Sequence, residues 1–186
     1  QLILERKMAA GERLTRIVLT HHHEDHVGGV KALQANFDVP VAAHPVTADR
    51  LRGRILIDEF LEDGDTISFG KGRFLRVMHT PGHARGHVIL HEDTAGWSVV
   101  GDMVAGQGTI VIDPPEGNMV DYLSQLERMK ACNFRMMIPA HGGVIVNPMA
   151  WLEKYIAHRH WREGVILDAI EERGSLTIPA IVPIYL

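Results

Sequence analysis

Cysteine is almost absent from this sequence of 186 residues, since Cys132 is the only one. No intramolecular disulfide can form, and a cysteine-based zinc site is excluded, so a bound metal would need nitrogen and oxygen ligands. We interpret Cys132 as a small core residue and not as a nucleophile.

Long apolar runs and a large excess of charge are also missing. No stretch of about 18 apolar residues is present, which excludes a predicted transmembrane helix. The segment Gln1–Ala10 lacks the basic-then-apolar order of a signal peptide. The formal net charge of −4 does not indicate binding to nucleic acid or to anionic membranes. Local basic patches remain an alternative. We therefore expect a soluble, cytoplasmic globular protein without a membrane partner.

Histidine, by contrast, is frequent, with 12 residues placed unevenly. The β-branched run Arg16–Thr20 predicts a strand, and the pattern H-x-H-x-D-H follows it directly. Alternation puts His21 and His23 on one side, while the turn brings Asp25 and His26 round to a second point. The motif therefore predicts two neighbouring metal half-sites instead of one four-ligand cage.

Three further ligand-type residues stand where a predicted strand gives way to a loop. They are His83, Asp102 and His141, and glycine or proline flanks each of them. Such neighbours let the backbone pass close to a metal. Five histidines and two aspartates suit zinc, and a carboxylate such as Asp102 can bridge two cations. We therefore predict two Zn²⁺ per chain.

Strand and helix patterns alternate along the rest of the chain, after an amphipathic segment Leu2–Ala10. Further strands are predicted at Val41–Ala43, Asp65–Phe69, Arg73–His79, His87–His91, Trp97–Gly101 and Met136–Ile138. Helices are predicted at Val30–Phe37, at Val120–Lys130 and from the N-cap Asn147 to Gly174. This order predicts an α/β protein in which helices cover sheets.

The motifs resemble those of the metallo-β-lactamase superfamily, from the first strand to the long helix. The resemblance implies a four-layer αββα sandwich with the metals at one edge of the sheets. It implies that His21, His23 and His83 bind the first zinc, that Asp25, His26 and His141 bind the second, and that Asp102 bridges them.

A narrower resemblance is to the β-lactamase-like protein 2 branch, which is close to the glyoxalase II thiolesterases. It rests on Thr80-Pro81-Gly82-His83 with Gly86-His87, Gly106-Gln107-Gly108-Thr109, Pro139-Ala140-His141-Gly142, and Tyr155-Ile156-Ala157-His158-Arg159 with Arg162-Glu163. That branch carries a C-terminal winged-helix-like element and includes endonucleases selective for single-stranded RNA.

The chain departs from the family at both ends. The usual N-terminal strands are missing, and the sequence stops just inside the winged-helix-like part. We therefore expect an N-terminally incomplete metallo-β-lactamase domain over 1–146 and a long helix with the start of the winged-helix-like element over 147–186. A protein of these residues alone is expected to be poorly stable, because a sheet edge would be uncovered.

The predicted chemistry is hydrolysis by a metal-bound hydroxide. Paired cations lower the pKa of a shared water and polarise the bond to be broken. Asp25 and Asp102 are the predicted catalytic residues, with Asp25 orienting the nucleophile. His87 is a candidate contact to a ligand or to substrate, with a satisfied strand histidine equally favoured, and Arg85 is a candidate contact to an anionic substrate.

Several functions stay open. Cleavage of single-stranded RNA leads, and a glyoxalase II-like thiolester hydrolase is the alternative. A mononuclear iron persulfide dioxygenase is the rival from another class. A nucleic-acid-binding module with structural metals would use Lys154, Arg159 and Arg162 beside His158, His160 and Trp161. True β-lactamase activity is not expected, because no export signal is present. A homodimer is left open.

Overall fold

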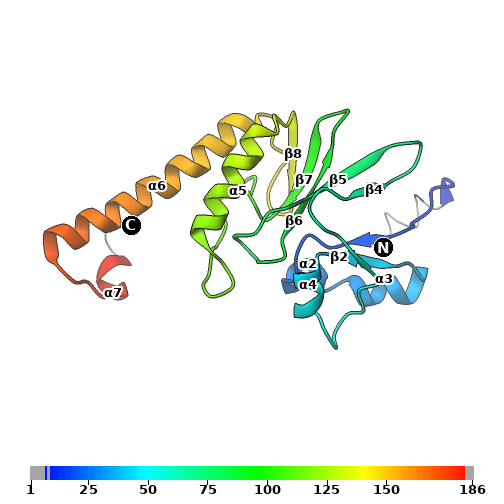
Figure 1. Cartoon of the computed structure of the whole chain (residues 1–186), viewed down its shortest axis with the longest axis horizontal. Coiled ribbons are helices and arrows are strands. Elements are labelled where there is room, and N and C mark those ends of the chain that lie inside the picture. The colour runs from blue at the N-terminus through cyan, green and yellow to red at the C-terminus, as the bar shows by residue number, and fades with distance from the viewer. Residues whose placement is uncertain (1–6, 8, 183–186) are drawn as a thin grey trace.

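Two β-sheets pack against each other in the computed structural model, which describes residues 7 and 9–182 (Figure 1). The smaller sheet is parallel, with the order β1-β2-β3, and consists of β1 (Ile17–Val18), β2 (Val41–Ala43) and β3 (Glu59–Phe60). The larger sheet has the order β4-β5-β6-β7-β8 and consists of β4 (Thr66–Ser68), β5 (Phe74–His79), β6 (Val88–Glu92), β7 (Trp97–Gly101) and β8 (Met136–Pro139). Its strands are antiparallel except for the parallel pair β7–β8.

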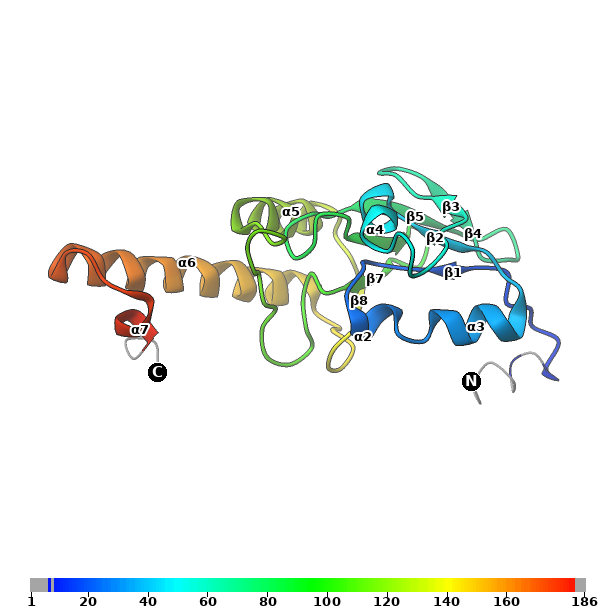
Figure 2. The same ribbon diagram turned by 90° about the horizontal axis from the view of Figure 1, so that it is seen from below.

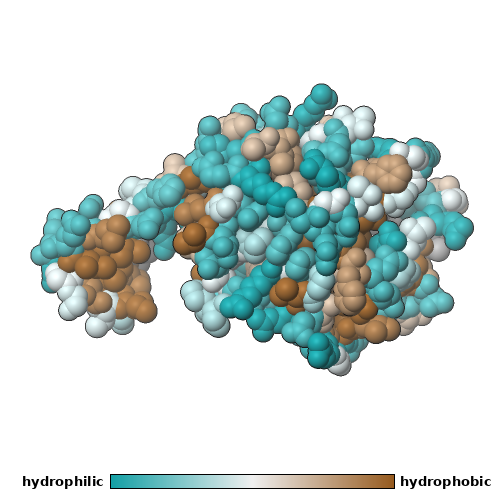
Figure 3. Space-filling model, viewed as in Figure 1, coloured by the Kyte–Doolittle hydropathy of each residue, from teal (hydrophilic) through white to brown (hydrophobic). Residues whose placement is uncertain are grey.

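Helices cover the outer faces of the two sheets (Figure 2). On the side of the smaller sheet lie α2 (Glu24–Val27), α3 (Val30–Phe37) and α4 (Pro45–Arg50), whereas α5 (Met119–Ala131) and α6 (Pro148–Arg173) lie against the larger one. The second half of α6 projects from the body, and α7 (Ile178–Ile181) folds back beside its end. Hydrophobic side chains gather on the surface of this projecting end (Figure 3).

Strand β2 explains why the layers stack in this way. Its side chains alternate, so Val41 and Ala43 join the apolar cluster under the first helices, whereas Ala42 joins the cluster between the two sheets. All three residues are fully buried. The sequence of a parallel strand that is covered on both faces is typically a continuous apolar run, and Val41–Ala43 is such a run.

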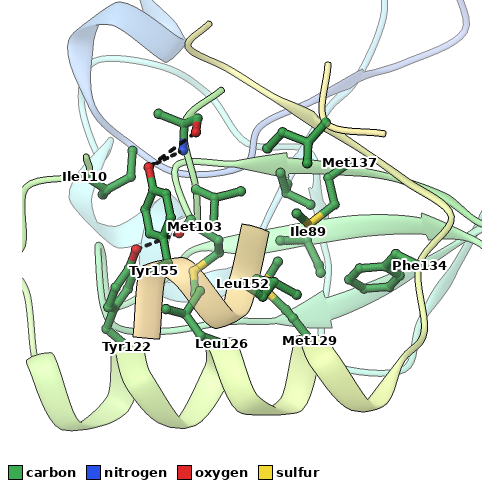
Figure 4. Close-up of a cluster of buried hydrophobic side chains, with 14 of the residues drawn as sticks. Ile89, Met103, Ile110, Tyr122, Leu126, Met129, Phe134, Met137, Leu152 and Tyr155 are labelled. Carbon is green, nitrogen blue, oxygen red and sulfur yellow. Dashed lines mark hydrogen bonds between the residues drawn. The ribbon is translucent and has the colours of Figure 1, made fainter. Parts of the chain in front are cut away.

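The largest apolar cluster lies between the larger sheet and the helices α5 and α6 (Figure 4). Tyr122, Leu126 and Met129 follow each other at helical spacing on α5, and all three are fully buried. Leu152 and Tyr155 bring α6 onto the same cluster. Burial of this stripe holds the two helices against the larger sheet.

The predicted α/β sandwich of two sheets between helices is confirmed, and most predicted elements are present within one or two residues. The helix α4 and the short strand β3 were not predicted. The segment Leu2–Ala10 lies largely outside the described residues. After α6 the described residues hold only the four-residue helix α7, so the winged-helix-like element stays a prediction. None of the helices in the described part is long and apolar enough to cross a membrane.

Candidate metal centre

The histidine motif occupies the loop that leaves β1 and enters α2. The loop is fixed between the two sheets, since Leu19 N–H donates to Ala42 O and Val88 N–H donates to Thr20 O. His23 is the N-cap residue of α2, with an extended backbone. Because the chain turns into the helix at this point, the next side chains face a second position. This is the two-sided arrangement that the motif predicted.

Three imidazoles converge at the first position. His21 Nε2 lies 3.0 Å from His23 Nδ1, and His83 Nε2 lies 3.3 Å and 3.0 Å from these two atoms. Nitrogens at about 2.0–2.1 Å from a tetrahedral zinc would be roughly 3.3 Å apart. Lone pairs this close repel each other unless a proton or cation lies between them. The spacing therefore fits three ligands of one metal ion.

Two histidines and a carboxylate form the second group, at the open side of the loop. His141 Nε2 lies 3.3 Å from Asp25 Oδ2, and His26 Nε2 lies 3.5 Å from the same oxygen. The side chains of Asp25 and His141 are 59% and 49% exposed, whereas that of His26 is 10% exposed. A ligand at the second group could thus be reached from solvent.

Asp102 lies between the two groups. Its Oδ2 is 3.5 Å from His83 Nε2 and 3.4 Å from His26 Nε2, and its Oδ1 is 3.5 Å from His141 Nε2. Burial alone would raise the pKa of this carboxyl, but the surrounding histidines, His26 above all, hold it below its ordinary value. Asp102 is therefore a carboxylate at neutral pH, in position to contact ligands on both sides.

The donor set fits a pair of cations. Burial lowers the pKa of His21, His23 and His83, so these rings are neutral and their nitrogens can donate electron pairs. Among the described residues, His26 Nε2 and Asp102 Oδ1 are buried without a hydrogen-bond partner. Buried polar atoms normally have a partner, and two metal ions would supply it here. All seven predicted ligand residues are brought together by the structure.

His83 is oriented by the backbone of a neighbouring loop. Its Nδ1–H donates to Val111 O at 2.8 Å, which leaves the Nε2 lone pair for the metal position. Gly82 allows the segment that carries His83 to pass close to α5, because a Cβ on Gly82 would lie 2.3 Å from Cα of Tyr122. The outer hydrogen bond fixes the tautomer and direction of the ring.

Of the two further candidates, His87 contacts the ligand residue Asp102, whereas Arg85 contacts a neighbouring loop. His87 is fully buried behind Asp102, so it does not reach substrate. Arg85 is exposed, but its Nη2 donates to Pro115 O at 3.0 Å and its backbone N–H donates to Glu116 Oε1 at 3.2 Å. Arg85 therefore supports the loop at the mouth of the site.

The predicted basic surface of α6 requires a correction. Arg159 is 8% exposed and its guanidinium donates to backbone and hydroxyl oxygens of the loop 109–110. Helical spacing alone could not reveal these partners. Trp161, on the other hand, is 56% exposed, and Lys154 lies over the ring of Trp151. Arg159 is thus unavailable to a nucleic acid.

The metal position opens into a pocket of about 430 Å³. Besides five of the ligand residues, the pocket is lined by Thr109, Ile110, Val111, Asp113 and Glu116. Among the described residues, the lining of this pocket therefore includes two further carboxylates and no lysine or arginine, although Arg50 and Arg85 contact Glu116 from outside the lining.

A histidine–aspartate cluster at the strand ends of an αββα sandwich defines a metal-binding hydrolase fold. The chain belongs to the metallo-beta-lactamase superfamily, whose family model matches residues 1–141. The superfamily is one of hydrolases, in agreement with the expected class.

Individual relatives extend the match beyond the family model. A beta-lactamase-like protein 2 homolog of Drosophila melanogaster is 31% identical over 180 residues, which cover 89% of this chain and 57% of the relative. An atrochrysone carboxyl ACP thioesterase of a Cryptosporiopsis species is 30% identical over 185 residues, covering 91% and 53%. A hydroxyacylglutathione hydrolase of Bdellovibrio bacteriovorus is 39% identical over 95 residues, covering 51% and 36%. The chain thus spans about half the length, or less, of these curated relatives.

Among solved structures, a beta-lactamase domain protein from Burkholderia ambifaria superposes with a TM-score of 0.79. It is 23% identical, and the match covers 97% of this chain and 67% of that protein. At this identity the likeness supports the fold alone. It includes the projecting helix α6, because the match extends over nearly the whole chain.

Proposed function

We propose that this protein is a zinc-dependent hydrolase with two metal ions per chain, and that it acts on a thiolester or a related ester. The observation that carries the proposal is the convergence of seven histidine and aspartate side chains, with Asp102 between the two groups. When bound, paired zinc ions would supply an activated water and polarise the carbonyl of the substrate.

Different side chains of the site would have different roles in the reaction. Asp102 is buried and would contact both metal positions, so it would fix the distance between the two half-sites. Asp25 is exposed on the open side, with Oδ2 3.3 Å from His141, and would accept a hydrogen bond from the attacking nucleophile. The pocket walls at Ile110 and Val111 would exclude water from the apolar part of the substrate.

The charge of the pocket mouth supports a substrate of low negative charge. Asp113 and Glu116 line the mouth, whereas the nearby Arg50 is paired with Glu116 at 2.5 Å. The phosphodiester backbone of RNA would meet the carboxylate of Asp113 there, whereas the charge of Glu116 is offset by Arg50. One relative described above is named as an ACP thioesterase and another as a hydroxyacylglutathione hydrolase, and these names also support this substrate class.

Single-stranded RNA is the second candidate. The Drosophila relative matches 89% of this chain, and the resemblance to its branch was the basis of the RNA prediction. The half-exposed side chains of Asp25 and His141 would also leave room for a large substrate. With Arg159 buried, binding would depend on Lys154 and other scattered charges, so weak and salt-sensitive affinity is expected.

A substrate panel would separate these candidates. Zinc-loaded protein would be assayed with S-lactoylglutathione, single-stranded RNA, a simple phosphodiester and a β-lactam, with Asp25→Asn as the inactive control. We expect thiolester turnover that disappears in Asp25→Asn. Cleavage of single-stranded RNA without thiolester turnover would replace the proposal by the second candidate.

A further inference from the structure

Three side chains of α6 point at one loop. Trp151, Tyr155 and Arg159 recur at intervals of four residues, so they form a single stripe on the helix. The loop consists of residues 105–111 and follows closely after Asp102 in the chain. At its start, Trp151 Nε1–H donates to Ala105 O at 3.0 Å.

Tyr155 contacts the middle of the 105–111 loop. Its hydroxyl accepts from Ala105 N–H at 2.9 Å and lies 3.1 Å from Gly108 O, to which it can donate. The ring belongs to the large apolar cluster, so the hydroxyl is held in place by packing (Figure 4). The two bonds join residues that are three positions apart in the loop.

Arg159 contacts the end of the same loop. Its Nη2 donates to Thr109 Oγ1 at 3.1 Å and also to Ile110 O. The guanidinium carbon lies 5.4 Å from the ring centroid of Tyr122, close enough for a cation–π interaction. Burying a guanidinium is costly unless its donors are bound. Here Nη2 has two acceptors, whereas Nε of Arg159 is among the described buried atoms without a hydrogen-bond partner, so the Nη2 contacts are the ones that tie Arg159 to the loop.

The 105–111 loop in turn touches two metal ligands of different half-sites. Val111 O accepts the Nδ1–H of His83 at 2.8 Å, and Gly106 N–H donates to His141 O at 2.8 Å. A movement of the loop would therefore turn the ring of His83 and shift the backbone of His141.

We infer that Arg159 and Tyr155 are positioning residues for the metal centre, acting from α6 through the 105–111 loop. Arg159 fixes the Ile110 carbonyl, which is one peptide from the carbonyl that orients His83. Tyr155 fixes the part of the loop that holds His141. The long helix is thus part of the metal site, although none of its side chains is a ligand.

The test compares the metal affinity of single variants. Arg159→Met removes the donors and keeps most of the volume, Arg159→Lys restores a cation, and Tyr155→Phe removes only the hydroxyl. Arg173→Met makes the same change as Arg159→Met in the exposed last turn of α6, so it serves as the matched control. Zinc dissociation constants would be measured by competition with a chromophoric chelator, and cobalt(II) spectra would report the ligand geometry.

Loss of an outer contact to a metal ligand commonly weakens binding by about 10- to 100-fold. Arg159 acts one contact further from the metal, so we expect a weakening of up to about 10-fold in Arg159→Met, a partial recovery in Arg159→Lys, a smaller loss in Tyr155→Phe and no change in Arg173→Met. The cobalt spectrum should change in Arg159→Met. If Arg159→Met does not fold, Tyr155→Phe and Thr109→Val provide the same comparison.

A purely structural role would lower the melting temperature and leave the dissociation constants and the cobalt spectrum of the folded variants as in wild type. That result would overturn the inference. The inference rests on the metal site of the proposed function and not on the identity of the substrate. Failure of wild-type protein to bind zinc would refute the proposed function, whereas normal binding by the variants would refute only the positioning role.

Discussion

The backbone N–H of Asp102 donates a hydrogen bond of 3.1 Å to Nε2 of His87. The other ring nitrogen of His87 donates to Thr80 Oγ1 at 2.8 Å, so the tautomer is fixed on both sides. Burial lowers the pKa of His87 to about 3, and the ring is neutral. Gly101 allows this contact, since its φ is 48° and an added Cβ would lie 2.6 Å from His87 Nε2.

Replacement of His87 by leucine should therefore disturb Asp102. The variant leaves the Asp102 N–H buried without an acceptor, which costs about 1–3 kcal/mol of unfolding free energy. Denaturant unfolding would measure this loss, and metal analysis should show weaker retention. His160→Leu, at an exposed position of α6, is the control, with a change of about 0.5 kcal/mol or less. Equal losses in both variants would contradict the assigned role of His87.

A methyl group at position 106 should damage the metal site from the backbone side. A Cβ on Gly106 would lie 2.1 Å from Gly143 O, so the 105–111 loop or the segment after His141 must move. Gly106→Ala is therefore expected to destabilise the protein and to weaken the half-site that contains His141. Gly143→Ala is the matched control, because its Cβ would meet no atom within 4 Å. Wild-type zinc binding by Gly106→Ala would show that the contact is unimportant.

Protonation of His44 should destabilise the fold in mildly acidic solution. His44 Nδ1 accepts from Val46 N–H at 3.2 Å at the start of α4, and its ring stacks on His79 at 4.0 Å. Burial, assisted by His79, lowers the pKa of His44 from 6.5 to about 4. As the pH falls below 6.5 the unfolded chain binds this proton before the folded chain does, so stability is lost between pH 6.5 and 4.

Asparagine at position 44 keeps a capping acceptor and does not titrate in this range. Melting temperatures of wild type and His44→Asn would be measured from pH 7.5 to pH 4.5. The difference between the two proteins cancels the titration of the metal ligands, which both contain. We expect the variant to lose less stability on acidification. Parallel curves for both proteins would contradict the prediction.

The sequence predicted the elements whose patterns are local. The apolar run Val41–Ala43 is found as β2, and the helical stripe from Val120 to Lys130 is found as α5, one residue longer at each end. Helix α4 was missed because it has only six residues and its N-cap is His44, outside the usual set of capping residues.

Contacts between residues far apart in the chain could not be predicted from the sequence. The motif predicted which residues would meet at the metal position, because strand ends and flanking glycines mark them. It did not predict that Arg159 is buried, since its acceptors lie about 50 residues earlier in the chain, in a loop without a regular pattern. His87 was left between a contact to ligand or substrate and a strand histidine, and only the hydrogen bond from Asp102 distinguishes these interpretations.

Metal content is the most direct test of the proposed binuclear site. The protein would be produced with zinc and iron both available, purified without chelators and analysed by plasma mass spectrometry. We expect two zinc ions per chain in wild type, about one in His141→Ala, and loss from both positions in Asp102→Ala. One iron per chain with no zinc would contradict the zinc hydrolase account and favour a mononuclear iron dioxygenase.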